Sequence, residues 1–494
     1  MVTGDDIAAM IASRREWLLV REDGRAFSLL SEEIEVTAEN GKTLFSFPGE
    51  KGYNTWRLNG WEEKGKELTV DVAGAFGRDQ QFLRLIPRTP ATETSAAIEA
   101  ARLEKANEIA ELLSNLPAIS IESVRLNMPG GRIAQVIFRD HQLRIAAVYD
   151  VTGELTHEAL MGAAMVWFDK TLANRKKPVA LVHVIAEGRR AHLLQKLHAL
   201  LSPRWRQIIS VHKVSRKTEP PEIKELPKLN ISGLWREKAR GLVLPKETKP
   251  SRSAADIIAK APDDIDIIYS RNGETLRFNG MPFARIRRVS GAEKIWFGTG
   301  RRMQLLDERN TEQFGVELEQ MQLHRRANSP NKRHAYYQAS PESWLESILR
   351  RDIKLLDGNL IPAPIYNQFR SSNDKIDLLA LRNDGRLVVV EVKAKPDRDA
   401  ILQVTDYWRK IELQRRRGVL AEADLFDGRE ISDRPAIIYL AAPALSFHSD
   451  TEFFMRSVAP EFEIWRFELH QNWREKIRVI GRRSQSEPSG TTNL

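Results

Sequence analysis

One run of seven residues limits the fold more than any other feature of this sequence. Residues 387–393 read Leu-Val-Val-Val-Glu-Val-Lys. Because side chains alternate between the two faces of a strand, this run is apolar on both faces, which is typical of a central strand in a covered sheet. Glu391 and Lys393 share one face at the end of the run. Two charges in that position are costly unless they are paired or bind something.

A second carboxylate is expected near the first. Asp377 opens another apolar strand, and an Asp-Gly turn at Asp384 and Gly385 joins that strand to the run above. A hairpin with this turn places Asp377 near Glu391 across the ladder. Two carboxylates and Lys393 then converge at one end of the sheet. Such oxygen ligands suit Mg²⁺ or Mn²⁺. A lysine beside them could orient or help deprotonate a water, or neutralise charge in a phosphoryl transition state.

The helices predicted around these strands add three candidates. Gln403 and Tyr407 lie four residues apart, so they share one face of the helix predicted over 400–417 and could reach the site as supporting partners. Glu346 lies at the edge of the packed stripe of the helix predicted over 341–356. It is interpreted as a further ligand of a metal or a water, with a solvated helix position as the alternative.

The residues around Asp377 resemble a known family. Asp377, thirteen residues and then an acid-x-Lys triplet beginning at Glu391 stand within a predicted order of helix, three strands, helix and strand. This pattern resembles the PD-(D/E)XK phosphodiesterase superfamily. The spacing Gln403-x-x-x-Tyr407 is similar to the third motif of its RecB-like branch, and mismatch-type endonucleases with a comparable C-terminal nuclease domain are similar as well. The resemblance covers residues 341–441, about a fifth of the chain.

The resemblance implies a restriction-endonuclease-like α/β domain with a divalent-metal site. It implies that Asp377, Glu391 and the Val392 carbonyl hold Mg²⁺, or Mn²⁺, and that Lys393 assists. One departure from the family pattern is that no proline precedes Asp377, at a position that the family tolerates loosely. The candidate catalytic residues are Asp377, Glu391, Lys393, Gln403 and Tyr407.

The patterns along the chain predict a multidomain protein. Short alternating runs in the first part, broken by Asp-Gly and Asn-Gly turns, predict a small all-β domain. The following stretch predicts an αβββαβα module, which repeats the αβββαβ order of the C-terminal part without sequence identity that supports a duplication. The predicted parts are a β-barrel or sandwich 1–92, an α/β module 93–202, a basic, proline-containing linker 203–260, a small α+β segment 261–335, the nuclease-like domain 336–482 and a disordered tail 483–494.

The first α/β module lacks the chemistry of the second. Its third strand leads to Tyr149 and Asp150 without an acid-x-Lys triplet. Asp140 and Asp150 could bind a metal, but turn residues at strand ends are the favoured interpretation. If this module shares the nuclease fold, we expect it to be an inactive, degenerate copy that serves in binding or in dimerisation, and a homodimer is left open.

The amino-acid composition limits the classes of binding partner and of functional site that are expected. Lys and Arg number 76 against 67 Asp and Glu, and the net charge of +9 favours polyanions. The absence of cysteine excludes thiolate zinc sites, iron–sulfur clusters and a cysteine nucleophile, and fits a cytoplasmic location. No apolar run approaches the roughly 18 residues of a membrane span, so no membrane partner is expected. Basic clusters that could together form a phosphate-tracking groove, although each alone is typical of a solvated face, lie at 285–288, 324–326, 332–334 and 415–417.

These observations predict a divalent-metal-dependent nuclease that hydrolyses phosphodiester bonds in nucleic acid, with DNA as the first expectation. One alternative is a catalytically inactive nucleic-acid-binding protein that retains a nuclease fold. The other is a scaffold with no nucleic-acid partner, in which Glu391 and Lys393 form a structural ion pair.

Overall fold

The computed structural model describes residues 4–485 apart from 40, 50–51, 66, 75–79, 89–90, 174–177, 217–220, 239–248, 271–272, 290, 300–302 and 364–376. The chain divides into two compact units, which are described separately. The first unit is Met1–His198 with Trp205–Lys228, and the second is Ala199–Arg204 with Leu229–Leu494. Within the described residues, no helix combines the length and the apolar character needed to cross a bilayer.

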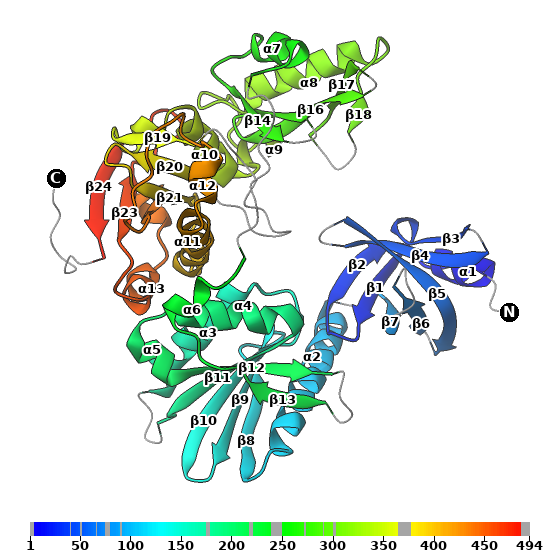
Figure 1. The fold of residues 1–494 in the computed structure, drawn as a ribbon. Coiled ribbons are helices and arrows are strands. Elements are labelled where there is room, and N and C mark those ends of the chain that lie inside the picture. The colour runs from blue at the N-terminus through cyan, green and yellow to red at the C-terminus, as the bar shows by residue number, and fades with distance from the viewer. Residues whose placement is uncertain are drawn as a thin grey trace. The chain divides into compact units, whose positions relative to one another are not determined.

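The first unit begins with an antiparallel half-barrel sheet, shown in blue in Figure 1. Its seven strands lie in the order β2-β1-β7-β6-β5-β4-β3, and its core includes Trp17, Phe45 and Phe47. This agrees with the all-β domain predicted for the start of the chain. The elements are α1 Gly4–Ala12, β1 Glu16–Arg21, β2 Ala26–Leu30, β3 Glu35–Glu39, β4 Lys42–Gly49, β5 Gly52–Lys64, β6 Glu67–Ala73 and β7 Gln80–Pro87.

The first unit continues with a mixed six-stranded sheet of order β13-β12-β11-β10-β9-β8. Helix α2 packs its apolar stripe on one face of this sheet. The strands are β8 Ile119–Leu126, β9 Ile133–Asp140, β10 Leu143–Asp150, β11 Leu181–Glu187, β12 Ile209–Ser215 and β13 Glu222–Glu225. The helices are α2 Ala91–Ser114, α3 His157–Trp167, α4 Gly188–Ala199 and α5 Pro203–Ile208.

Strands β12 and β13 correct the linker predicted over 203–260, which is too long. Both strands belong to the first α/β sheet, so that module extends to Glu225. The prolines of this stretch misled the prediction because they flank the elements instead of interrupting them. Pro203 begins α5, and Pro227 follows β13. A proline is tolerated at the first position of a helix and beyond the end of a strand.

The second unit contains a small antiparallel sheet of order β14-β15-β16-β17-β18. Helices α7 and α8 supply Ile257, Phe314 and Leu318 to its core, so this part begins before the predicted residue 261. The elements are α6 Ile231–Leu234, α7 Arg252–Ile258, β14 Ile265–Ser270, β15 Gly273–Phe278, β16 Met281–Val289, β17 Ala292–Phe297, β18 Gln304–Leu305, α8 Thr311–His324 and α9 Ala335–Gln338.

The second unit ends with a mixed six-stranded sheet of order β19-β20-β21-β22-β23-β24. The strand predicted over 365–369 lies outside the described residues, and β24 runs two residues into the predicted tail. The strands are β19 Leu360–Pro362, β20 Leu378–Arg382, β21 Leu387–Val392, β22 Ile437–Pro443, β23 Ile464–Leu469 and β24 Val479–Ser484. The helices are α10 Pro341–Arg351, α11 Ala400–Arg416, α12 Val419–Glu422 and α13 Thr451–Ser457.

The two six-stranded sheets have the same topology. In the first, β8, β9 and β10 are antiparallel neighbours, β10, β11 and β12 are parallel neighbours, and β13 pairs antiparallel at the edge. Strands β19 to β24 repeat this order and these directions. The αβββαβ order that the sequence predicts twice therefore corresponds to one architecture that occurs twice.

Strand β21 lies between two helices. Its residues Val388, Val390 and Val392 belong to the same core as Trp344 and Leu349 of α10. Helix α11 packs against β21 and β22 on the other face. Because side chains alternate along a strand, residue 391 lies on the face of α11, as does residue 393 just beyond the strand. The strand that the sequence predicts to be covered on both sides is therefore covered on both sides.

Candidate active site

The β20–β21 hairpin brings Asp377 and Glu391 to opposite positions. Leu378 pairs with Val390, and the two carboxylates lie one residue further along each strand. Asp377 also accepts a hydrogen bond through Oδ2 from the Val392 N–H at 2.9 Å. The turn that sets this register contains Gly385, whose φ of 79° favours glycine. The hairpin and the position of Asp377 agree with the sequence-based expectation.

Lys393 joins Glu391 to Gln403 of α11. Its Nζ lies 3.0 Å from Glu391 Oε1 and 2.7 Å from Asp397 Oδ2, and it donates a hydrogen bond to Gln403 Oε1 at 2.8 Å. Sequence reasoning missed Asp397. The one available signal was its position four residues after Lys393, in the loop that leads into α11.

Burial perturbs both charges at the end of β21. Glu391 is 3% exposed, and this burial raises the pKa of its carboxyl well above the usual value. The charge of Asp377 raises that pKa further, while Lys393 acts in the opposite direction. For Lys393, burial alone would lower the pKa, but the charges of Glu391 and Asp397 outweigh it, so the pKa is raised. Burial therefore makes the charged form of Glu391 costly unless a cation lies beside it.

One carboxylate oxygen of this cluster has no hydrogen-bond partner among the described residues. Glu391 Oε2 is buried and accepts no hydrogen bond from any residue that the structure describes. A buried carboxylate oxygen without a partner costs free energy, and a bound cation is one way to satisfy it. Asp377 provides a second carboxylate across the ladder, so the donor set fits Mg²⁺ or Mn²⁺, which prefer carboxylate oxygen.

The two candidates on α11 have different surroundings. Gln403 holds the Lys393 ammonium, which makes it a supporting residue of the cluster. Tyr407, one turn further along, is half-buried, and the Lys410 Nζ lies 5.3 Å from the centroid of its ring. A catalytic role for Tyr407 stays a prediction, as does the metal-binding role of the Val392 carbonyl.

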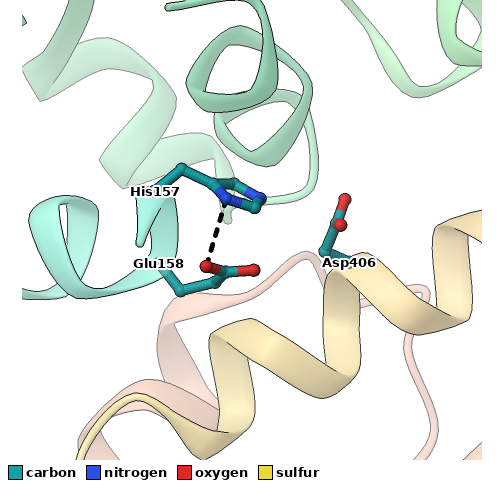
Figure 2. A group of neighbouring side chains, drawn as sticks. All are labelled: His157, Glu158 and Asp406. Carbon is teal, nitrogen blue, oxygen red and sulfur yellow. Dashed lines mark ion pairs between the residues drawn. The ribbon is translucent and has the colours of Figure 1, made fainter. Parts of the chain in front are cut away.

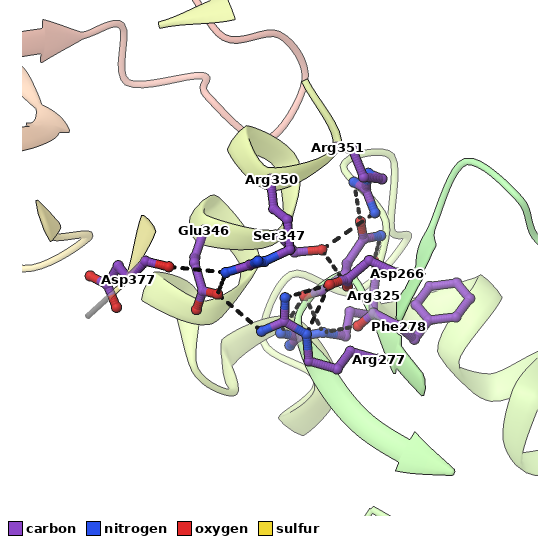
Figure 3. A network of polar contacts seen from close by, with 10 residues as sticks. Asp266, Arg277, Phe278, Arg325, Glu346, Ser347, Arg350, Arg351 and Asp377 are labelled. Carbon is purple, nitrogen blue, oxygen red and sulfur yellow. Dashed lines mark hydrogen bonds and ion pairs between the residues drawn. The ribbon is translucent and has the colours of Figure 1, made fainter. Parts of the chain in front are cut away.

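Glu346 is buried beside the cluster, with 1% of its surface exposed, and is not a solvated helix position. Its Oε1 lies 3.3 Å from Arg277 Nη1 and 3.2 Å from Arg350 Nη2. Arg350 Nη2 also donates a hydrogen bond to the Asp377 carbonyl oxygen at 3.0 Å, as Figure 3 shows. These ion pairs account for the burial of Glu346, and its role as a metal ligand stays a prediction.

The same network reaches the small β14–β18 sheet. Arg277, on β15, donates from Nε to Asp266 Oδ2 at 2.9 Å, and the Ser347 hydroxyl donates to Asp266 Oδ1 at 2.7 Å (Figure 3). Arg277 thus bridges Asp266 of the small sheet and Glu346 of α10. Sequence reasoning missed this bridge because its partners are 69 residues apart, and no local pattern pairs residues at that distance.

In the first unit, β10 has the place in its sheet that β21 has in the second unit, but the side chains at its end differ in chemistry. Asp150 ends β10, and its Oδ1 accepts hydrogen bonds from the N–H of Thr152 at 3.0 Å and from its hydroxyl at 2.7 Å. Its Oδ2 accepts from the Leu155 N–H at 2.9 Å and lies 2.6 Å from Arg190 Nη1. Four hydrogen bonds thus satisfy this carboxylate, and one of them comes from a guanidinium group.

Figure 2 draws three buried side chains that belong to different units. His157 and Glu158, at the start of α3, form an ion pair of 3.1 Å between Nδ1 and Oε2. Asp406, on α11, lies 2.8 Å from both Arg409 Nε and Lys410 Nζ. Each group has a partner within its own unit, and none of the three adds to the site around Glu391.

The candidate site therefore consists of Asp377, Glu391 and Lys393, supported by Gln403 and Asp397. Searches with this chain against protein-family models, curated proteins and solved structures found no match.

Proposed function

We propose that the protein is a divalent-metal-dependent nuclease whose active site lies at the ends of β20 and β21. The observation that carries the proposal is the meeting of Asp377, Glu391 and Lys393 at one sheet edge, with a buried Glu391 oxygen that lacks a partner among the described residues. A purely structural ion pair would not require a second carboxylate across the ladder, nor would it leave a buried oxygen unsatisfied.

Each residue has a role that follows from its position. Asp377 and Glu391 would hold Mg²⁺ or Mn²⁺, which would supply Lewis-acid activation of water and of the phosphate. Asp397 and Gln403 hold the Lys393 ammonium beside Glu391. In that place the ammonium can orient the attacking water and stabilise the negative charge that develops on the phosphoryl oxygens.

The order α10-β19-β20-β21-α11-β22 supports a restriction-endonuclease-like fold for this module, as the resemblance to the PD-(D/E)XK superfamily implies. We propose that the first α/β module is an inactive copy of it. The equal topology supports this relation, and the Asp150–Arg190 pair supports the loss of activity, because a guanidinium group occupies one oxygen that a metal would need.

The test is cleavage of end-labelled DNA and RNA with Mg²⁺ or Mn²⁺. We expect wild type to cleave at least one of them and both Asp377→Ala and Lys393→Ala to lose activity by about 100-fold or more. Lys354→Ala is the matched control, because Lys354 ends an acid-x-Lys triplet but is exposed, and it should cleave like wild type.

Equal activity of all four proteins would refute the proposal. Salt-sensitive nucleic-acid binding without turnover, unchanged by a chelator, would instead favour a binding protein that retains the fold. The absence of both binding and turnover would favour the scaffold.

A further inference from the structure

Four residues form a strip on one face of the small sheet of the second unit. Arg285 and Arg287 are on β16, and Lys294 and Trp296 are on β17. Arg285 pairs with Trp296, and Arg287 pairs with Lys294. Because paired residues share a face and every second residue of a strand returns to it, all four side chains project from the same face. We call these four residues the β16–β17 strip.

The cations of the strip are exposed and available. Arg285, Arg287 and Lys294 are all exposed, and none has an ion-pair partner among the residues that the structure describes. Other arginines of this unit do have ion-pair partners, as Arg277 has in Asp266 and Arg386 has in Glu463. Unpaired cations gathered on one surface are an electrostatic footprint for a polyanion.

The strip also offers an aromatic ring between its cations. Trp296 is half-buried, and the Arg287 guanidinium carbon lies 6.0 Å from its ring centroid. Arg285 and Arg287 are two residues apart, which corresponds to about 7 Å along a strand. A ring flanked by cations on a sheet face suits a nucleic-acid strand whose bases are unpaired, since a base can stack on the ring while phosphates contact the cations.

The strip is continuous with the candidate active site through the sheet. Thr275 on β15 pairs with Arg285, and Arg277 follows two residues later on β15, just past a shift in register between Leu276 and Arg277. Arg277 contacts Glu346, which shares Arg350 with the Asp377 carbonyl. The small sheet that carries the strip therefore contacts α10 of the proposed catalytic module through Arg277, as Figure 3 shows.

We propose that the β16–β17 strip binds single-stranded nucleic acid, with a base stacked on Trp296 and phosphates on Arg285, Arg287 and Lys294. This inference rests on the proposed function in one respect, namely that the bound strand is the substrate of the nuclease site. The binding itself requires no metal. A duplex would present phosphates but no free base face, so it would lose the contribution of Trp296.

The test is fluorescence anisotropy of a labelled single-stranded oligonucleotide of about 12 nucleotides with the full-length protein in a chelator. The Arg285→Gln/Arg287→Gln variant should bind at least tenfold more weakly and should lower the slope of log K against log salt by about 1.4. Arg288→Gln is the control: it removes one charge, where the double variant removes two, from the next residue of β16, on the opposite face, and should bind within about twofold of wild type.

A second variant tests the ring. Trp296→Leu should weaken binding by about 5- to 100-fold, and Trp296→Phe should lose less because it keeps a face for stacking. Melting temperatures within about 2 °C of wild type would verify that these variants fold.

Three results would overturn the proposal: equal losses in the double variant and in Arg288→Gln, a preference for duplex over single strand, or equally effective competition by an acidic polypeptide. Its failure is distinguishable from that of the nuclease activity. Cleavage with binding that the strip variants leave unchanged refutes the strip alone, whereas binding through the strip without cleavage refutes the nuclease alone.

Discussion

Replacing Arg277 should destabilise the second unit strongly. Arg277 is 2% exposed and lies between Asp266 and Glu346, two carboxylates that are themselves buried. The Arg277→Met variant keeps an apolar side chain of similar length, but Asp266 and Glu346 both lose their ion pair with the guanidinium group. Removing one partner of a buried ion pair costs about 3–5 kcal/mol, because the remaining charge is left uncompensated in a site that excludes water.

The remaining contacts set the size of the effect. Glu346 keeps Arg350 at 3.2 Å, and Asp266 keeps the Ser347 hydroxyl at 2.7 Å. Neither carboxylate is then fully orphaned, so we expect the low end of that range, about 3 kcal/mol. For a unit of this size the loss corresponds to a fall of the melting temperature by about 6–12 °C.

The assay is urea and thermal unfolding followed by circular dichroism. Arg288→Met is the control, because Arg288 is exposed and its replacement should cost less than about 0.5 kcal/mol. In the Arg277→Met/Glu346→Gln double variant the losses should be non-additive by about 1–3 kcal/mol, since the two residues are in contact. A loss below about 1 kcal/mol for Arg277→Met, or full additivity, would refute the role of the bridge.

Three further predictions concern other parts of the chain. Gly280→Ala should cost more than Gly291→Ala, although both glycines have φ near 80°, because a Cβ at residue 280 would meet the backbone of α10 at 1.9 Å whereas residue 291 faces open space; equal melting temperatures of the two variants would contradict this. Burial, with a smaller contribution from the charge of His212, lowers the pKa of His183 to about 3, and burial lowers the pKa of His212 to about 4 although Glu225 opposes it. Both values lie below the unfolded value of about 6.5, so stability is complete above that pH and falls by about 2 kcal/mol per histidine at pH 5. The double variant with Phe at both positions should lose about 4 kcal/mol less than wild type between pH 8 and pH 5 in urea unfolding, and an equal loss would be evidence against the shifts. If Glu391 serves a metal site, as we propose, Glu391→Gln measured in a chelator should leave the free energy of unfolding unchanged or raise it by about 1 kcal/mol, because a buried charge is replaced by a neutral group; a fall of 3 kcal/mol or more would favour the structural ion pair.

The prediction of the β20–β21 hairpin rested on the alternation of polar and apolar residues. Strand β21 and its Asp-Gly turn could be read from local pattern, because burial on both faces and a two-residue turn signal act over short distances. The opposition of Asp377 and Glu391 then follows from strand register alone. A supporting role for Gln403 could also be predicted, because helix periodicity puts Gln403 on one face near the start of α11, where it accepts a hydrogen bond from Lys393.

The features that could not be predicted depend on packing between residues that are far apart in the sequence. The surroundings of Glu346 depend on Arg277, which belongs to the small β14–β18 sheet. The periodicity of α10 gives no indication of this contact. Strands β12 and β13 were not predicted because their stretch is rich in prolines, and because the pairing of β12 with β11 and of β13 with β12 depends on tertiary structure. In the sequence, the β16–β17 strip could be recognised only as a basic cluster. The pairing of Arg285 with Trp296 depends on the register between two strands, which the sequence of either strand alone does not determine.

Binding of Mn²⁺ to the full-length protein, followed by the loss of the free-ion signal in electron paramagnetic resonance, tests the central claim most directly. If Asp377 and Glu391 form a metal site, wild type will bind at least one Mn²⁺ ion per chain, and the Asp377→Asn/Glu391→Gln variant will bind it at least tenfold more weakly while keeping its fold. No binding by wild type, or equal binding by both proteins, would contradict the account.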